Sequence, residues 1–134
     1  DTDYAFLASL RLAKLQQQQG KPEAALAALD KAEKVSLNEQ NRELAKIRKL
    51  QMLISQGKLA DAGKLAASLK AVYYPGSLAD IRGDLALAAG NRTQAAAYYK
   101  EALLKLDPDA GSRALIELKL TEAGGSADKA QEIR

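Results

Sequence analysis

Apolar residues recur at the spacing of an α-helix along most of the chain. In the first segment Leu7, Leu10 and Ala13 fall on one helical face, with Leu15 close by. The same kind of pattern recurs downstream. It predicts seven helices, over residues 3–19, 22–34, 39–56, 59–73, 77–89, 93–106 and 109–123. Ser77 is the expected N-cap of the fifth helix. Because β-branched residues are sparse, no sheet is expected.

The predicted inward faces consist mainly of alanine and leucine, and aromatic residues make up only 4% of the chain. A core of this kind is built from close helix–helix contacts. The expected core positions of the second to fourth helices are Ala25, Leu26, Ala28, Leu29 and Ala32, then Leu44, Ile47, Leu50 and Ile54, then Ala62, Leu65, Ala66 and Leu69.

A turn glycine recurs three times, as Gly20, Gly57 and Gly90, and an alanine follows each one five residues later. Glycine tolerates the left-handed conformation at the end of a helix. A repeat length in the thirties is typical of helix–turn–helix units stacked into a solenoid.

The third unit resembles a tetratricopeptide repeat. The matching positions are Gly83, Gly90, Ala95, Tyr99, Ala102 and Pro108. Gly83 is expected to let two helix backbones approach closely, and Ala95 and Ala102 are small where the two helices cross. Tyr99 is expected to fill the gap between repeats. We therefore predict an all-α, tetratricopeptide-like solenoid of about three helix pairs plus a C-terminal capping helix, over residues 1–123. A flexible polar tail is expected over residues 124–134.

Several kinds of chemistry are excluded by composition. The chain has no histidine and no cysteine, so it lacks the residues for serine–histidine or cysteine–histidine catalysis and for zinc sites built from those ligands. No catalytic, cofactor-binding or metal-binding residue is expected, and on this ground we predict that the chain is not an enzyme. Asp80 and Asp84 share one helical face. They are either a cation site or partner contact, or part of a solvated face neutralised by bases such as Arg82.

The net charge of +3 is too weak to argue for nucleic acid, since no dense basic cluster is interleaved with aromatic residues. Arg42, Lys46 and Lys49 recur at helical spacing in the third helix. They either meet an acidic partner or lipid headgroups, or form an ordinary solvated surface. Tyr73 and Tyr74 precede a Pro-Gly pair; we expect one of them to be packed, and the other is packed or an exposed contact.

The first helix of each pair is expected to line a partner-binding groove. By the repeat register, the residues that point into it are Lys14, Gln17, Gln51, Asp80 and Asp84. Binding through loops or through the opposite face is the alternative.

Two motifs carry a more specific resemblance. The run from Tyr4 to Ala13 (YAFLASLRLA) and the run from Ala79 to Asp84 (ADIRGD), followed by Leu87 and the Gly90 turn, resemble the YfgM-type ancillary subunit of the SecYEG translocon. Members of that family have one membrane-spanning helix and a periplasmic tetratricopeptide-like domain.

The resemblance implies a periplasmic domain, anchored to the inner membrane in the full-length protein. It implies SecYEG and the chaperone PpiD as partners, together with emerging secreted chains. The sequence starts without methionine and has no apolar run of the ~20 residues that cross a bilayer, so we expect the anchor to have been cut away. The alternative is a tetratricopeptide scaffold of another envelope assembly, such as a pilus or outer-membrane complex, or of a regulatory complex.

Overall fold

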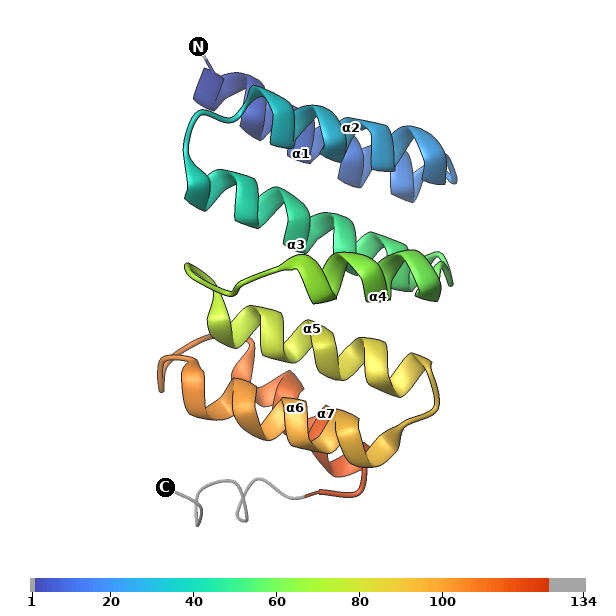
Figure 1. Ribbon diagram of the computed structural model, residues 1–134, viewed down its shortest axis with the longest axis vertical. Coiled ribbons are helices and arrows are strands. Elements are labelled where there is room, and N and C mark those ends of the chain that lie inside the picture. The colour runs from blue at the N-terminus through green and yellow to red at the C-terminus, as the bar shows by residue number, and fades with distance from the viewer. Residues whose placement is uncertain (1, 126–134) are drawn as a thin grey trace. The chain divides into compact units, whose positions relative to one another are not determined.

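The computed structural model describes residues 2–125, and in that part of the chain every regular element is an α-helix (Figure 1). The all-α prediction is confirmed. The helices are α1 (Thr2–Gln18), α2 (Pro22–Val35), α3 (Glu39–Ser55), α4 (Leu59–Ser68), α5 (Pro75–Ala88), α6 (Arg92–Lys105) and α7 (Arg113–Glu122). The tail expected over residues 124–134 lies, from residue 126 on, outside the described residues.

The three recurrent glycines end α1, α3 and α5 in one shared way. Gly20, Gly57 and Gly90 have φ values of +74°, +74° and +84°, in the left-handed region that a side chain strains. After each glycine the next N–H donates to a carbonyl five residues earlier. These bonds are Lys21 to Gln16 at 2.8 Å, Lys58 to Leu53 at 2.9 Å and Asn91 to Ala86 at 2.9 Å. The glycines are therefore the turns within three helix pairs, as predicted.

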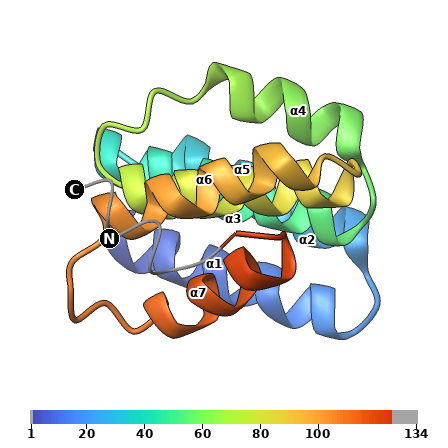
Figure 2. The same ribbon diagram turned by 90° about the horizontal axis from the view of Figure 1, so that it is seen from below.

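The chain divides into two compact units, one up to Tyr73 and one from Tyr74. In the first unit α2 packs against both α1 and α3, and α4 packs against α3. In the second unit α6 packs against both α5 and α7. Within each unit successive helices of a pair run in opposite directions (Figures 1 and 2).

The predicted core is largely correct in α2 to α4. The residues confirmed as buried are Ala25, Ala28, Leu29, Ala32, Ile47, Leu50, Ala62, Ala66 and Leu69. Leu26, Leu44, Ile54 and Leu65 are partly exposed. These four long side chains lie at the borders of the apolar stripes, where part of each remains in solvent.

For α1 the predicted face was partly wrong. Ala13 is buried, but Leu7 and Leu15 are 51% and 48% exposed. The face that packs on α2 and α3 is instead that of Phe6 and Ala13, seven residues apart. The leucines off this face remain available to solvent.

Helix α4 ends at Ser68, five residues before the predicted boundary. Leu69 is extended and Ala71 has a φ of 54°, unusual for a residue other than glycine. The N–H groups of Val72 and Tyr73 donate to the two carboxylate oxygens of Glu43, each at 2.9 Å. This buried carboxylate on α3 replaces the helical partners of the segment.

Two predicted helix starts in the second unit are also corrected. Helix α5 begins at Pro75, with Tyr74 rather than Ser77 at the N-cap position. Helix α7 begins at Arg113, not at residue 109, because the chain first makes a turn closed by the Ala110 N–H and the Asp107 carbonyl at 3.0 Å. Tyr74 is partly buried and Tyr73 is 46% exposed, so the packed tyrosine of that pair is Tyr74.

Tyr99 is fully buried in the core of the second unit. A Cβ built on Gly83 would lie 2.6 Å from Cδ1 of the Tyr99 ring. The three atoms nearest to that Cβ all belong to the Tyr99 ring, so the glycine makes room for an aromatic side chain. The cluster around Tyr99 contains residues from α5, α6 and α7.

Candidate binding groove

A groove of about 570 Å³ lies between α1 and α3 of the first unit. Helix α2 packs against both, and Leu29 of α2 contributes to its lining. Three predicted groove residues, Lys14, Gln17 and Gln51, line it together. Their juxtaposition follows from the repeat, since α1 and α3 are the first helices of successive pairs. Their role in binding stays a prediction.

The inner lining of the groove is apolar. Leu10, Ala13, Leu29 and Met52 all line it, and they belong to one cluster with Ala28 in the core of the first unit. Leu7 extends this apolar strip toward solvent, where about half of its side chain is exposed. The groove is thus an opening onto the core, and a ligand in it would cover apolar surface.

The charged residues of the groove all have the same sign. Arg11 and Lys14 come from α1 and Arg48 from α3, and among the described residues no aspartate or glutamate lines the groove. Among residues 2–125 none of these three cations makes an ion pair. Their positive charge is therefore available to a ligand.

One end of the groove is bridged by hydrogen bonds. The Gln17 amide donates to Ser55 Oγ at 3.1 Å, and the Gln56 amide donates to Gln17 Oε1 at 3.1 Å. Sequence analysis assigned no role to Ser55 or Gln56. They are the two residues before Gly57, as the glutamine run comes just before Gly20, and this shared position is a sequence signal for a polar contact between the two helix ends.

Asp80 and Asp84 lie in the second unit, where both contact Lys119 of α7. The Lys119 Nζ is 2.7 Å from Oδ1 of Asp80 and 2.9 Å from Oδ1 of Asp84. The same Asp84 oxygen accepts a hydrogen bond from the Tyr99 hydroxyl at 2.6 Å. Lys119 also lies 5.2 Å from the centre of the Tyr99 ring. This arrangement gives the two carboxylates a structural role between α5, α6 and α7.

The protonation of this cluster reflects burial and its ion pairs. Burial raises the pKa of Asp80, and the ion pair with Lys119 offsets only part of that rise. For Lys119 burial disfavours the cation, but the ion pairs with Asp80 and Asp84 outweigh it and leave the pKa above its ordinary value. Burial, together with the hydrogen bond to Asp84, raises the pKa of Tyr99.

The basic residues that the sequence singled out on α3 have acidic neighbours in the structure. Arg42 lies 2.6 Å from Glu39, Lys46 lies 3.6 Å from Glu33 and Lys49 lies 2.7 Å from Asp30. Two of these pairs join α3 to α2. These three basic residues thus lie on a partly exposed surface on which each has an acidic neighbour within the unit.

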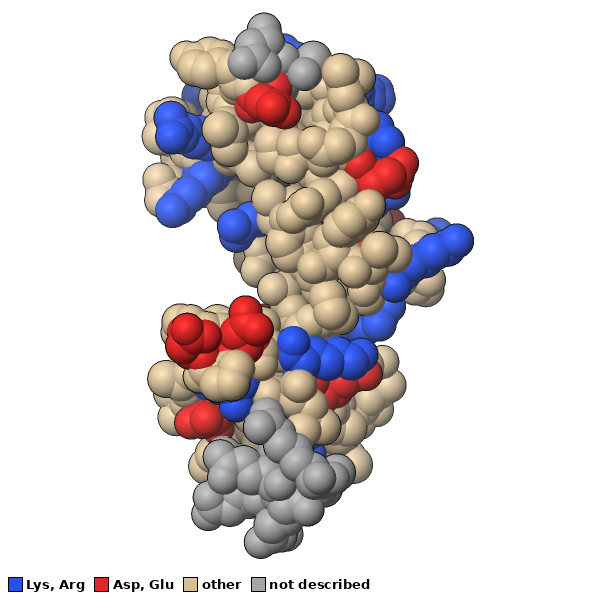
Figure 3. Space-filling view, turned by 90° about the vertical axis from the view of Figure 1, so that its left-hand side faces the viewer, with Lys and Arg blue, Asp and Glu red and all other residues tan. Residues whose placement is uncertain are grey.

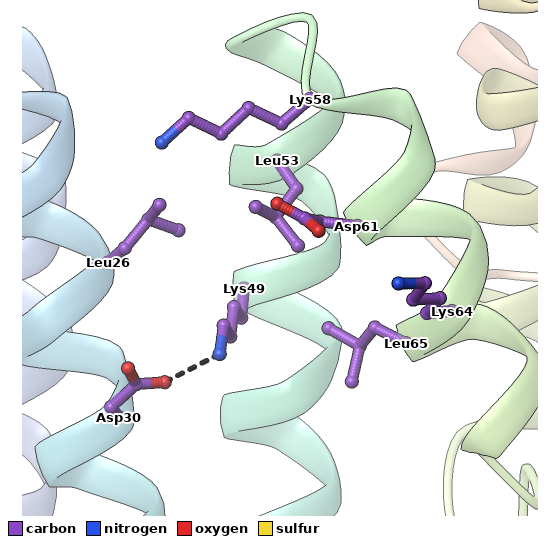
Figure 4. Close-up of a pocket in the computed structure, with 8 residues that line it drawn as sticks. All are labelled: Leu26, Asp30, Lys49, Leu53, Lys58, Asp61, Lys64 and Leu65. Carbon is purple, nitrogen blue, oxygen red and sulfur yellow. Dashed lines mark hydrogen bonds and ion pairs between the residues drawn. The ribbon is translucent and has the colours of Figure 1, made fainter.

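A second hollow, of about 470 Å³, lies among α2, α3 and α4 (Figure 4). Lysines and aspartates both line it, and Lys49 bonds to Asp30 across it. It uses a different face of α3 from the first groove, with Lys49 and Leu53 in place of Arg48 and Met52. Its mixed charges favour no single kind of ligand, so the groove between α1 and α3 is the stronger candidate.

Within the described residues no cluster of acidic side chains has the arrangement of a metal site. No helix in that part of the chain is long and apolar enough to cross a membrane.

Comparison with known proteins identifies the fold family. The family model of the tetratricopeptide repeat-like domain matches residues 1–125 of this chain. Searches of curated proteins and of solved structures each gave no match. The match covers nearly the whole chain, and the helix pairs joined at Gly20, Gly57 and Gly90 agree with it. This all-α chain therefore belongs to the tetratricopeptide repeat-like domain family.

Proposed function

We propose that this chain is a non-enzymatic protein-interaction domain that binds a polypeptide in the groove between α1 and α3. Tetratricopeptide-like domains are in general modules for protein partners. The observation that carries the proposal is the groove itself, where an apolar lining is open to solvent beside three cations that make no ion pair within residues 2–125. Such a surface gains free energy when a protein segment covers it.

We further propose that the domain belongs to an inner-membrane-anchored accessory protein of the SecYEG translocon and lies in the periplasm. There it would act with the chaperone PpiD on secreted proteins. The support is the resemblance carried by the segment from Tyr4 to Ala13, whose Tyr4, Leu7 and Leu12 side chains are largely exposed on α1. Exposed apolar residues in that motif are consistent with a contact to another protein.

The motif from Ala79 to Asp84 supports this assignment less directly. Ala79, Ile81 and Gly83 are buried, and the two aspartates bind Lys119. Packing of the second unit accounts for these residues. A scaffold in another envelope assembly therefore stays the alternative, since it needs the same fold without the same partners.

The test is site-specific photo-crosslinking in intact membranes with the full-length protein. A photoreactive residue at Gln51, exposed on α3 and lining the groove, is expected to crosslink to SecYEG, PpiD or a chain in transit. The matched control is Lys64, exposed on α4 and outside the groove. Crosslinks from Gln51 only to components of a pilus or outer-membrane assembly would support the alternative. Equal crosslinking from both positions would remove the groove from the proposal.

A further inference from the structure

We infer that the occupant of the groove between α1 and α3 is an amphipathic helix of a partner protein that carries acidic residues on both sides of its apolar stripe. This inference rests on the proposed function and specifies the chemistry of the segment bound.

The first argument is charge. In the described chain the groove presents Arg11, Lys14 and Arg48 without a counterion, while the basic residues elsewhere on α3 have acidic neighbours. The unit up to Tyr73 holds 12 Lys and Arg against 8 Asp and Glu, whereas the unit from Tyr74 holds 8 against 9. A partner segment with carboxylates therefore meets complementary charge at this groove.

Figure 3 shows how charges are spread over one face of each unit. On the part that contains α1–α4, Lys and Arg side chains lie on both sides of a broad uncharged area, and acidic side chains lie near its top and at its right-hand edge. On the part that contains α5–α7, acidic and basic side chains are intermixed. The excess of positive charge is a property of the first unit, where the groove lies.

The second argument is the arrangement of cations around the apolar lining. Arg11 and Lys14 are on the α1 wall, and Arg48 is on the α3 wall. Leu10 and Met52, which line the groove, come from the same two walls. A ligand that matches this pattern needs an apolar stripe with an acidic flank on either side.

A helix has this pattern and an extended strand does not. The side chains of a strand alternate between two opposite faces, so a strand that buries one face directs the other to solvent and has no lateral flanks. A helix with apolar residues at i, i+3, i+4 and i+7 has polar positions on both sides of its stripe. The lined part of α1, from Leu7 to Gln18, is about 16 Å long and accommodates roughly three helical turns.

The test uses designed peptides and the chain of residues 1–134. One peptide has a leucine stripe flanked by glutamates. A second has the same stripe flanked by lysines, and a third is the glutamate peptide with two prolines that prevent helix formation. We expect the glutamate peptide to bind at least about tenfold more tightly than either control in fluorescence anisotropy, with affinity that falls as salt rises. Equal binding by the lysine peptide or by the proline peptide would overturn the inference.

Protein variants locate the site. Arg11→Glu combined with Arg48→Glu is expected to weaken binding of the glutamate peptide about tenfold. The control, Lys58→Glu with Lys64→Glu, reverses two charges in the second hollow of the same unit and is expected to leave binding nearly unchanged. Leu7→Asp is expected to weaken binding, and Leu12→Asp, equally exposed on α1 but outside the groove, is not. Circular dichroism melts check that each variant folds.

The outcomes separate this inference from the proposed function. If the protein binds the glutamate peptide no more tightly than the controls but Gln51 still crosslinks to a translocon component, the inference of an acidic helix is wrong and the proposed function stands. If the peptide binds as expected but the crosslinks are absent, the assignment to the translocon alone is wrong. Sedimentation analysis that shows a dimer, abolished by Leu7→Asp, would make a second copy of this chain the occupant and would overturn the inference.

Discussion

In two places a single side chain on one helix restricts the conformation of another segment of the molecule. The Tyr99 ring occupies the space above Gly83, and its hydroxyl donates to Asp84. The Glu43 carboxylate accepts the N–H groups of Val72 and Tyr73. In both cases a group on one helix fixes the conformation of a segment distant in sequence, and a change of one residue tests it.

Replacement of Gly83 by alanine is expected to destabilise the protein by about 1–3 kcal/mol, because the new methyl group would overlap the Tyr99 ring. The ring cannot move away easily, since it is fully buried and hydrogen-bonded. Gly63→Ala is the matched control. Its Cβ would meet no atom within 4 Å, so better helix propensity should stabilise α4 by about 0.5–1 kcal/mol. Urea unfolding measures both variants, and equal effects would contradict this role of Gly83.

Replacement of Glu43 by alanine is expected to cost about 2–4 kcal/mol, because it removes the acceptor of two charge-assisted hydrogen bonds. Hydrogen exchange at the Val72 and Tyr73 amides should accelerate more than exchange in α1–α3. Glu39→Ala, at an exposed carboxylate of the same helix, should leave both stability and these amides nearly unchanged. Unaltered protection of Val72 and Tyr73 in the Glu43 variant would show that other contacts hold the segment.

At the scale of elements, the attachment of α7 depends on polar as well as apolar contacts. Ile116 and Leu120 are buried in the cluster around Tyr99. Beside them Lys119 bonds to two carboxylates of α5. At the start of α7 the Arg113 guanidinium donates to the Leu103 carbonyl at 2.8 Å, which satisfies a carbonyl near the end of α6.

Lys119→Met is therefore expected to lower the free energy of unfolding by roughly 1–3 kcal/mol. It keeps the aliphatic stem but leaves Asp80 and Asp84 without their cation, and their partial exposure keeps the loss below that of a fully buried pair. Lys105→Met, which removes an exposed pair with Glu101, should change stability by less than about 0.5 kcal/mol. Similar losses in chemical denaturation for both lysines would contradict a special role for Lys119.

The raised pKa of Lys119 also predicts a pH dependence. A cation stabilised in the folded state contributes stability that is fully present below its ordinary value of 10.5 and is lost as pH rises through the folded pKa. The stability difference between wild type and Lys119→Met should therefore be constant at neutral pH and shrink above that value. Denaturation curves from about pH 8 to pH 12 measure it. A difference that stays constant over this range would exclude the titration of Lys119 as a source of stability.

The limits of prediction from sequence are clearest at the ends of helices. The glycine turns were predicted because glycine itself supplies the left-handed conformation they need. The segment after α4 was not, because it is held by Glu43, whose hydrogen-bond partners Val72 and Tyr73 lie 29 and 30 residues further along the chain. For the candidate site, the repeat register correctly predicted that Lys14, Gln17 and Gln51 line the same groove. The register could not show that Asp80 and Asp84 bond to Lys119, since that partner lies outside the repeat.

At the scale of the whole molecule, the fold class follows from the family and from the helices. The balance of basic and acidic residues differs between the two units. The family model covers residues 1–125, and the helices within the described residues 2–125 agree with an all-α, tetratricopeptide-like fold. The positive charge in excess belongs to the first unit, although most of the basic residues on α3 have acidic neighbours. This distribution favours a localised contact with an acidic segment over binding to a long polyanion.

Binding to nucleic acid is accordingly expected to be weak. The cations without an ion pair in residues 2–125 can neutralise only a few phosphates at once. Because affinity for nucleic acid grows with the number of phosphates that are neutralised, so few contacts give weak binding. Fluorescence anisotropy with a 20-base-pair duplex should show no binding tighter than about 100 μM at physiological salt. Submicromolar binding under these conditions would contradict the absence of a nucleic-acid partner.

The sequence by itself determined the helices, their glycine turns, most of the buried alanines and leucines, and hence the fold family. These properties depend on local spacing and on the backbone preferences of single residues. The tertiary structure decided which leucines of α1 stay exposed, which cations are paired, and what holds the segment after α4 and the helix α7. Those outcomes depend on which side chains meet across helices, and a linear pattern does not specify such meetings.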